Sequence, residues 1–173
     1  MSTGWVVWIT GLSGAGKTTL SRPVAAALRD GGRNVVLLDG DELRGVIGGK
    51  IGHSEIERRE VAERYSHLCR LVSIQGVDVV CATMSLFHSR HVWNRANIPK
   101  YVEVYLKVDL ETLVARDPKG LYRRALAGEA SNVVGIDLPF EEPLAPDLVI
   151  DNNAERSDMD PLVDQVLSVL RRR

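Results

Sequence analysis

The chain has 173 residues, of which 45% are apolar and 26% are charged, so it can bury a core and we expect residues 1–173 to form a single domain. Its formal net charge of -1 disfavours a broad nucleic-acid-binding surface. Two cysteines exclude a disulfide framework, the apolar runs are too short to span a membrane, and no leader pattern opens the chain, so we expect a cytoplasmic protein.

Apolar runs alternate with helix-like segments along the chain. Strands are predicted at 5–10, 34–39, 77–82, 101–108 and 148–151, and helices at 17–30, 55–75, 109–116 and from 160 onward. Segment 40–52 is predicted to be irregular, and 83–97 to be a loop with one short helix at most. Segment 117–146 holds four of the seven prolines and is predicted to be a mobile lid. The alternation predicts an α/β fold, with a five-stranded parallel sheet covered by helices on both faces.

A phosphate-binding pattern follows the first predicted strand. Segment 11–18 reads G-x-x-x-x-G-K-T and stands directly before a predicted helix. Glycines let backbone N–H groups point at a phosphate chain, the helix N-terminus adds positive charge, and the lysine and threonine reach phosphate and Mg²⁺. The sequence therefore predicts a P-loop NTPase fold that binds ATP and Mg²⁺. The expected nucleotide contacts are Gly11, Ser13, Gly14, Ala15, Gly16, Lys17, Thr18 and Thr19.

An acidic pair, Asp39 and Asp41, follows the second predicted strand. Phosphate transfer to a hydroxyl needs a carboxylate that orients the hydroxyl and accepts its proton. We interpret Asp41 as this base and, with Thr18, as a Mg²⁺ ligand, while Asp39 supports it. Arginines suit phosphate and sulfate oxygens, and Arg44 and one of Arg58 and Arg59 are the candidates.

The class of nucleotide-using protein is narrowed by what the chain lacks. It has no Asn-Lys-x-Asp segment of a regulatory GTPase and is short for a mechanical ATPase. A small-molecule kinase fits the length and the lid. A non-catalytic nucleotide sensor stays open as the rival. His88 and His91 lack further ligands at metal-site spacing, so we expect no zinc site.

With these residues in hand, the chain resembles the adenylyl-sulfate kinase family over nearly its whole length. The marks are segments 11–19, 38–44, 58–60 and above all the lid segment 116–122, continuing to 135–137. The resemblance implies transfer of the ATP γ-phosphate to the ribose 3′-hydroxyl of adenylyl sulfate, with Mg²⁺, by a homodimer. It implies acceptor contacts by Arg44, Arg58 and Ser85, and a contact of Arg116 with the adenine side of ATP. It also implies that Lys119 contacts the reacting phosphate, and we count Lys119 as catalytic together with Asp41 and Lys17.

Departures from the family pattern gather on the acceptor side. The family usually has phenylalanine at the positions of His53 and Val133, asparagine at Val61, and Ser-Pro-Tyr-Arg at 85–88, where this chain has Ser-Leu-Phe-His. Loss of two stacking rings favours a different nucleotide-anhydride acceptor, such as cytidine diphosphoramidate, which would place the enzyme in capsule decoration. A true adenylyl-sulfate kinase of sulfate activation is the alternative. The expected acceptor contacts are Asp39, Arg44, His53, Arg58, Val61, Ser85, Leu86, Lys119 and Val133.

Overall fold

A computed structural model describes residues 2–47 and 51–173. Five parallel strands form one sheet in the order β2-β3-β1-β4-β5, which confirms the predicted fold class. The strands are β1 (Val6–Thr10), β2 (Val35–Asp39), β3 (Asp78–Thr83), β4 (Tyr101–Lys107) and β5 (Leu148–Asp151). The order places β1 at the centre, so the phosphate loop (residues 11–18) emerges from the middle of the sheet.

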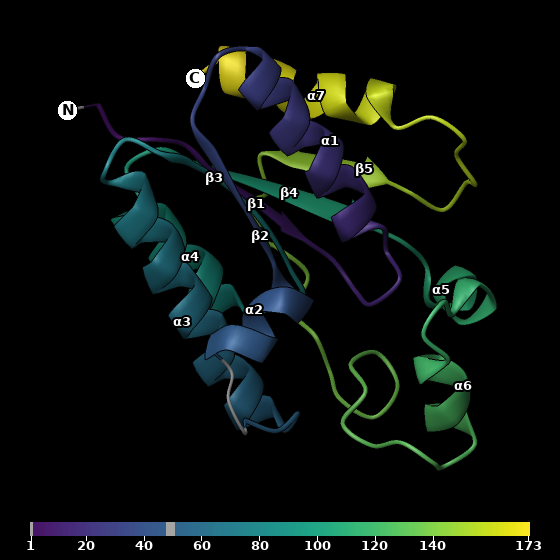
Figure 1. The fold of residues 1–173 in the computed structure, drawn as a ribbon. Coiled ribbons are helices and arrows are strands. Elements are labelled where there is room, and N and C mark those ends of the chain that lie inside the picture. Colours follow the sequence, from purple (N-terminus) through teal and green to yellow (C-terminus); the bar gives the residue numbers. More distant parts are fainter. Residues whose placement is uncertain (1, 48–50) are drawn as a thin grey trace.

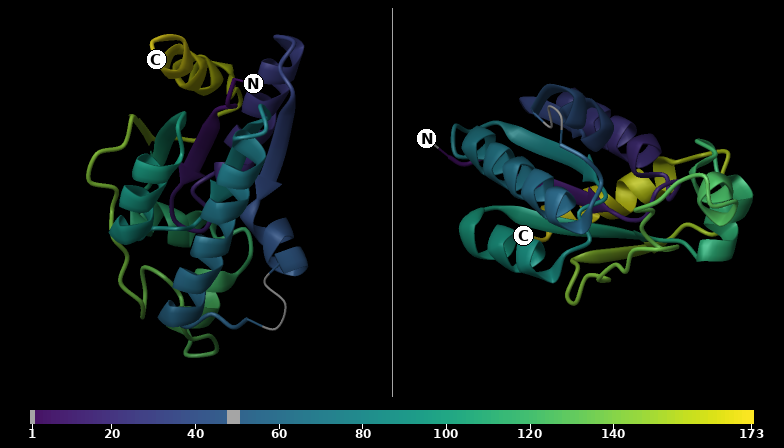
Figure 2. Two further views of the ribbon diagram at one scale, coloured as in Figure 1. Left: turned by 90° about the vertical axis from the view of Figure 1, so that its left-hand side faces the viewer. Right: turned by 90° about the horizontal axis from the view of Figure 1, so that it is seen from below.

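Helices cover both faces of this sheet (Figures 1 and 2). One face carries α1 (Lys17–Asp30) and α7 (Asp160–Arg171), and the other carries α3 (Glu55–Ser73) and α4 (His88–Asn97). The shorter helices α2 (Gly40–Ile47), α5 (Leu110–Arg116) and α6 (Leu121–Leu126) lie toward the carboxyl ends of the strands. Both chain termini lie at the other end of the sheet (Figure 1), away from the phosphate loop.

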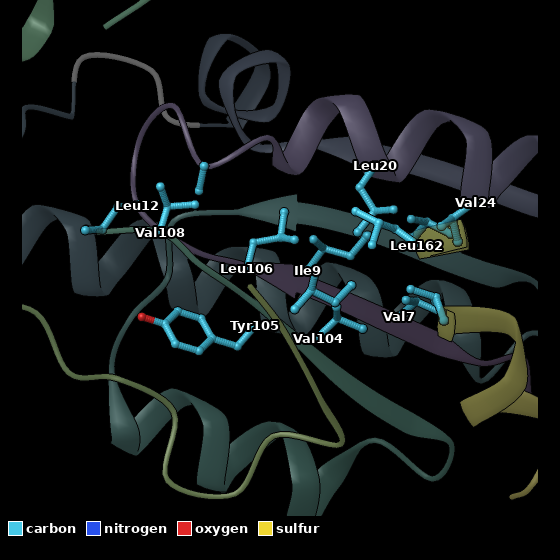
Figure 3. Close-up of a cluster of buried hydrophobic side chains, with 14 of the residues drawn as sticks. Val7, Ile9, Leu12, Leu20, Val24, Val104, Tyr105, Leu106, Val108 and Leu162 are labelled. Atoms are coloured by element: carbon cyan, nitrogen blue, oxygen red, sulfur yellow. The ribbon is translucent and has the colours of Figure 1, made fainter. Parts of the chain in front are cut away.

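Strand β1 is buried on both faces, as a central strand of a parallel sheet must be. Val7 and Ile9 point into the core beneath α1 and α7, where Leu20 and Leu162 meet them (Figure 3). The other side chains of the strand, among them Trp8, pack in the second core cluster with α3. The strand that presents the phosphate loop is therefore held rigidly from both sides.

The long helix α3 begins as its sequence predicts. Ser54 accepts a hydrogen bond from the N–H of Glu57, and the Glu57 carboxylate accepts one from the N–H of Ser54, which together form a capping box. The predicted helix 17–30 and the predicted strand 148–151 have the observed bounds.

Three segments are more helical than predicted. Residues 40–47 form α2 although they were expected to be irregular, because Asp41 and Glu42 favour a helix N-terminus and Leu43 is buried against α3. The prediction for 48–50 lies outside the described residues. Helix α4 fills most of the predicted loop 83–97, and α6 forms within the lid (residues 117–146). Among the described residues, no helix has both the length and the apolar character needed to cross a membrane.

Candidate active site

The phosphate loop is shaped by glycines in the left-handed backbone region. Gly14 and Gly16 have φ angles of 77° and 95°, and a Cβ on Gly16 would lie 2.9 Å from the Nδ2 atom of Asn152. Asn152 donates to the carbonyl of Ala15 at 3.0 Å, and the Tyr122 hydroxyl donates to the carbonyl of Ser13 at 2.8 Å. With these carbonyls engaged, the uncapped N–H groups at the start of α1 stay available to a phosphate.

Lys17 begins α1, and its ammonium group donates to the carbonyl of Leu12 at 2.7 Å. The pKa of Lys17 is lowered to about 8, first by burial and also by the nearby Lys119, although Asp41 and Asp39 raise it. A half-buried ammonium with so low a pKa has too few negative neighbours. A bound phosphate chain would supply them.

Asp39 organises the acidic pair through both of its carboxylate oxygens. The Thr18 hydroxyl donates to Oδ2 at 2.6 Å, and the backbone N–H of Asp41 donates to Oδ1 at 2.9 Å. Strand β3 separates β2 from β1, yet α1 crosses this gap and brings Thr18 to the end of β2. The Asp41 side chain is 73% exposed and forms an ion pair with Lys119 of the lid.

Hard oxygen ligands suit Mg²⁺, which usually keeps waters and takes one or two protein ligands beside nucleotide phosphates. The hydroxyl of Thr18 and the carboxylates of Asp39 and Asp41 meet this requirement. In the part of the chain that the structure describes, His, Cys, Asp and Glu form no group of three or more able to hold a metal ion. With one hydroxyl and two carboxylates beside the phosphate loop, the site fits a Mg²⁺ ion that binds together with nucleotide phosphates.

One cavity of about 700 Å³ joins the phosphate loop to the acidic pair, the end of β3 and the lid. The predicted site residues that line it are Ser13, Gly14, Gly16, Lys17, Thr18, Thr19, Asp39, Asp41, Arg44, His53, Arg58, Val61, Ser85, Lys119 and Val133. Sequence reasoning missed Ala62, Tyr65, Pro118, Leu121, Ala130, Ser131 and Asn132. Tyr65 could have been found, because it lies about two helical turns after Arg58 on the same face of α3.

Four predicted contacts do not line this cavity. Leu86 is 2% exposed and packs into the core, because the chain turns inward after Ser85. Gly11 and Ala15 are buried under the phosphate loop, where they allow its curvature. Arg116 lines a separate cavity on the other side of the loop.

Residues 51–53 and 130–133 lie at the part of the large cavity where acceptor contacts are predicted, and we call them the acceptor wall. Two arginines bind the backbone of this wall. Arg58 donates through Nε to the carbonyl of His53 and through Nη2 to that of Asn132, both at 2.8 Å. Arg44 donates to the carbonyls of Ile51 and Gly52. Burial and the nearby Arg44 lower the pKa of Arg58. The wall is therefore electropositive, which suits an anionic ligand.

Val133 sits in this wall because of a tight turn after it. Asp137 accepts hydrogen bonds from the N–H groups of Asn132 and Val133, and Asn132 adopts a φ angle of 60°. Val133 is 2% exposed. No phenylalanine or tryptophan is among the described residues that line the cavity, and the Tyr65 hydroxyl is engaged with the carbonyl of Gly40 at 2.9 Å. Among the wall residues that line the cavity, the exposed His53 carries the one aromatic ring, and Ala130 and Val133 are aliphatic.

The separate cavity has a volume of about 300 Å³ and lies across the phosphate loop from the acceptor wall. Arg116 donates to the carbonyls of Asn152, Asn153 and Ala154 at 2.8, 2.7 and 3.1 Å. It thereby holds the loop after β5 against Gly14, Gly16 and Thr19. Sequence reasoning noted Asn152 as a residue that follows a strand but missed Ala154, Glu155, Arg156 and Met159 in this cavity. Their signal was their position directly after a strand of a parallel sheet.

Comparison with known proteins agrees with this geometry. The model of the adenylylsulphate kinase family matches residues 3–151. The chain is 41% identical to the adenylyl-sulfate kinase of Myxococcus xanthus, over 99% of this chain and 94% of that protein. It is 36% identical to the cytidine diphosphoramidate kinase of Campylobacter jejuni, over 96% of each. The structure of the Mycobacterium tuberculosis APS kinase CysC in complex with AMPPNP and APS superposes with a TM-score of 0.90, at 32% identity over 99% of both chains.

Proposed function

Because the chain belongs to the adenylylsulphate kinase family and is an ATP-dependent kinase, we propose that it transfers the γ-phosphate of ATP to a ribose hydroxyl of a nucleotide-anhydride acceptor. One observation carries this proposal: a single cavity holds the phosphate loop at one end, an electropositive wall at the other, and Asp41 with Lys119 between them. Such a cavity can bring the phosphate chain of ATP and an acceptor nucleotide together, with their reacting groups facing each other. We retain a single domain over 1–173 and a homodimer as predictions.

The proposed mechanism assigns one task to each reacting group. Asp41 orients the acceptor hydroxyl and accepts its proton as the phosphate is transferred. Lys17 and Lys119 stabilise the negative charge on the transferred phosphate. Thr18, with Asp39 and Asp41, would hold Mg²⁺, which supplies further charge neutralisation. Lys119 faces Asp41 in this structure, so it must exchange that carboxylate for phosphate oxygens when the substrates bind. Closure of the lid then excludes water and prevents hydrolysis of ATP.

Adenylyl sulfate is the first candidate acceptor. Most of the similar proteins are named adenylyl-sulfate kinases, including the relative from Myxococcus xanthus. Arg44 and Arg58 suit a sulfate group, because a guanidinium binds two oxygens of a tetrahedral anion at once. Each arginine retains N–H groups beyond those spent on the wall carbonyls.

Cytidine diphosphoramidate is the second candidate, and a specific observation favours it. The acceptor wall presents Val133 and His53 where a stacking clamp would need two aromatic rings. Without two aromatic rings, the wall offers little stacking energy to a large purine, so a smaller base loses less by comparison. The Campylobacter jejuni relative, which bears the name of a kinase for this compound, is similar over nearly the whole chain.

The acceptor is tested by ADP release from ATP and Mg²⁺ with either nucleotide at matched low concentrations. We expect release with adenylyl sulfate, and none from a Lys17→Ala control. Release with the cytidine compound alone would reject adenylyl sulfate as the acceptor. No release with either, while ATP still binds, would contradict a kinase and favour the nucleotide sensor.

Replacing His53 by phenylalanine should strengthen adenylyl sulfate binding. The side chain is exposed beside the cavity, so a phenyl ring can stack on an adenine without displacing core residues. Base stacking contributes about 1–3 kcal/mol, of which the His53 ring already supplies a part, so we expect KM for adenylyl sulfate to fall about three- to tenfold. His53→Leu is the matched control, because it adds apolar area without a ring. An equal effect of both variants would show that stacking is not the cause.

Replacing Arg116 by alanine should weaken ATP binding without affecting the acceptor. The variant frees three carbonyls from their donor and loosens the loop after β5. We expect KM for ATP to rise about tenfold, while KM for the acceptor changes less than about twofold. Steady-state kinetics with each substrate varied in turn would measure both. If only the acceptor KM rose, the cavity lined by Arg116 would not be part of the ATP site.

A further inference from the structure

His91 of α4 lies beneath the loop that follows β3, which we call the acceptor loop (residues 83–87). Its Nε2 atom is 2.7 Å from the carbonyl oxygen of Ser85, and its Nδ1 atom is 3.1 Å from Oε1 of Glu103 on β4. The His91 and Glu103 side chains are 7% and 2% exposed. Both contacts are therefore shielded from water, and the groups must satisfy each other.

The chemistry of these atoms fixes where protons can lie. A carbonyl oxygen only accepts hydrogen bonds, so Nε2 of His91 must carry a proton to bind Ser85. In a neutral imidazole Nδ1 then has a lone pair, and it faces an oxygen of Glu103. Two lone pairs 3.1 Å apart repel each other unless one proton lies between them. That proton can belong to an imidazolium or to a carboxylic acid.

We propose that His91 and Glu103 are positioning residues that share one proton at neutral pH between Nδ1 and Oε1. The shared proton keeps a second proton on Nε2, and this second proton holds the acceptor loop through the carbonyl of Ser85. The inference rests on the proposed function, because Thr83, Met84 and Ser85 of this loop line the cavity near the acceptor wall. When the pair loses the proton at alkaline pH, the remaining one moves to Nδ1, where the carboxylate attracts it. Nε2 then has no proton, and Ser85 loses its donor.

The groups around the pair favour this behaviour. Arg95 binds Oε2 of Glu103 at 3.2 Å and also Asp147, so Oε1 is left for His91. Burial raises the pKa of Glu103 to about 7, against the opposing effect of Arg95, and burial lowers the pKa of His91. The charged or titratable groups that face the pair are Arg95 and His88 on α4, Tyr101 on β4, and Glu141 and Asp147 on the connector, with Arg173 paired to Asp147.

The acceptor loop depends on this contact because the sheet pairing of β3 ends at Thr83 and the other ties of the loop lie beyond Ser85. The carbonyl of Leu86 accepts from the N–H of Glu141 at 3.2 Å, and the N–H of His88 donates to the Glu141 carboxylate. The Ser85 hydroxyl is 3.0 Å from that of Thr83, a contact within the loop itself. Loss of the hydrogen bond to His91 therefore frees the main chain of Met84 and Ser85, which line the cavity, while Leu86 and His88 stay bound to Glu141.

Glu103→Gln tests the shared proton, because an amide keeps the shape and cannot titrate. Its oxygen accepts from Arg95, and its N–H₂ donates permanently to Nδ1 of His91. In the wild-type protein we expect the acceptor KM to rise about five- to tenfold from pH 7 to pH 9.5, as a buried hydrogen bond is lost. In the variant it should change less than about twofold. Titration of Lys17 affects kcat and the ATP KM equally in both proteins, so it can be separated from the change in the acceptor KM.

Nitrogen-15 NMR of the His91 ring supplies a readout that does not depend on activity. We expect a proton on Nε2 at pH 6.5 and on Nδ1 at pH 9.5 in the wild-type protein, and on Nε2 at both pH values in Glu103→Gln. A proton on Nδ1 alone at pH 6.5, or a variant KM profile that follows the wild type, would overturn the proposal. If neither acceptor is phosphorylated at pH 7, the proposed function fails, while the ring spectra still decide whether the pair shares a proton.

Discussion

Replacing Asp41 by alanine should lower kcat about 10²- to 10⁴-fold and leave ATP binding nearly unchanged, since that is the range that a general base contributes. The structure explains why the effects separate. The Asp41 carboxylate lines the cavity and forms an ion pair with Lys119. Asp39 holds Thr18 and the backbone of Asp41, so Thr18 and Asp39 would remain to hold Mg²⁺ in the variant. Single-turnover phosphate transfer and equilibrium binding of an ATP analogue would measure the two effects.

Glu42→Ala is the matched control, because Glu42 is an exposed carboxylate in the same turn of α2 and does not line the cavity. It should transfer phosphate at the wild-type rate. The Asp41–Lys119 pair is more than half exposed on both sides, so its loss should hardly change the melting temperature. A near wild-type rate in Asp41→Ala would show that another group accepts the hydroxyl proton.

The fold was predictable because its signals are local. Buried parallel strands appear as short apolar runs, and the phosphate loop marks where a central strand meets its helix. Helices α2 and α6 escaped prediction because they are short and lie among glycines and prolines. Each forms through contacts with distant residues, as when Leu43 packs against α3 and Tyr122 hydrogen-bonds to Ser13. Such tertiary contacts override weak local propensity.

The candidate site was predictable where its residues follow strands and hidden where the lid supplies them. Asp39 ends β2 and Asp41 follows two residues later, so their place near the phosphate loop follows from the sheet. Residues 130–133 are held at the cavity in part by Arg58, which binds the carbonyl of Asn132, 74 residues away along the chain. No local pattern encodes that contact. The pair formed by His91 and Glu103 was hidden for the same reason, because it joins a helix to a strand.

Replacing Lys17 by methionine should abolish phosphate transfer and at the same time stabilise the nucleotide-free protein at pH 7. The ammonium is the phosphate loop's charged contact for β- and γ-phosphates, so transfer should fall by about 10³-fold or more. Burial lowers its pKa from 10.5 to about 8, which means that keeping it charged at pH 7 costs folding free energy. Methionine fills similar space without this cost. We expect the unfolding free energy of the nucleotide-free variant to be about 1–3 kcal/mol higher than that of the wild type at pH 7. This corresponds to a rise of several degrees in melting temperature.

The pH dependence gives this stability prediction its sign. Between pH 8 and 10.5 the unfolded chain holds the Lys17 proton and the folded chain does not, so the wild-type unfolding free energy rises with pH relative to that of the variant. The advantage of Lys17→Met should therefore be full below pH 8 and vanish above about pH 10.5. Added ATP and Mg²⁺ should reverse the order at pH 7, because a bound phosphate chain stabilises only the wild-type ammonium. A variant that melts below the nucleotide-free wild type at pH 7 would show that the ammonium is already compensated by Asp39 and Asp41.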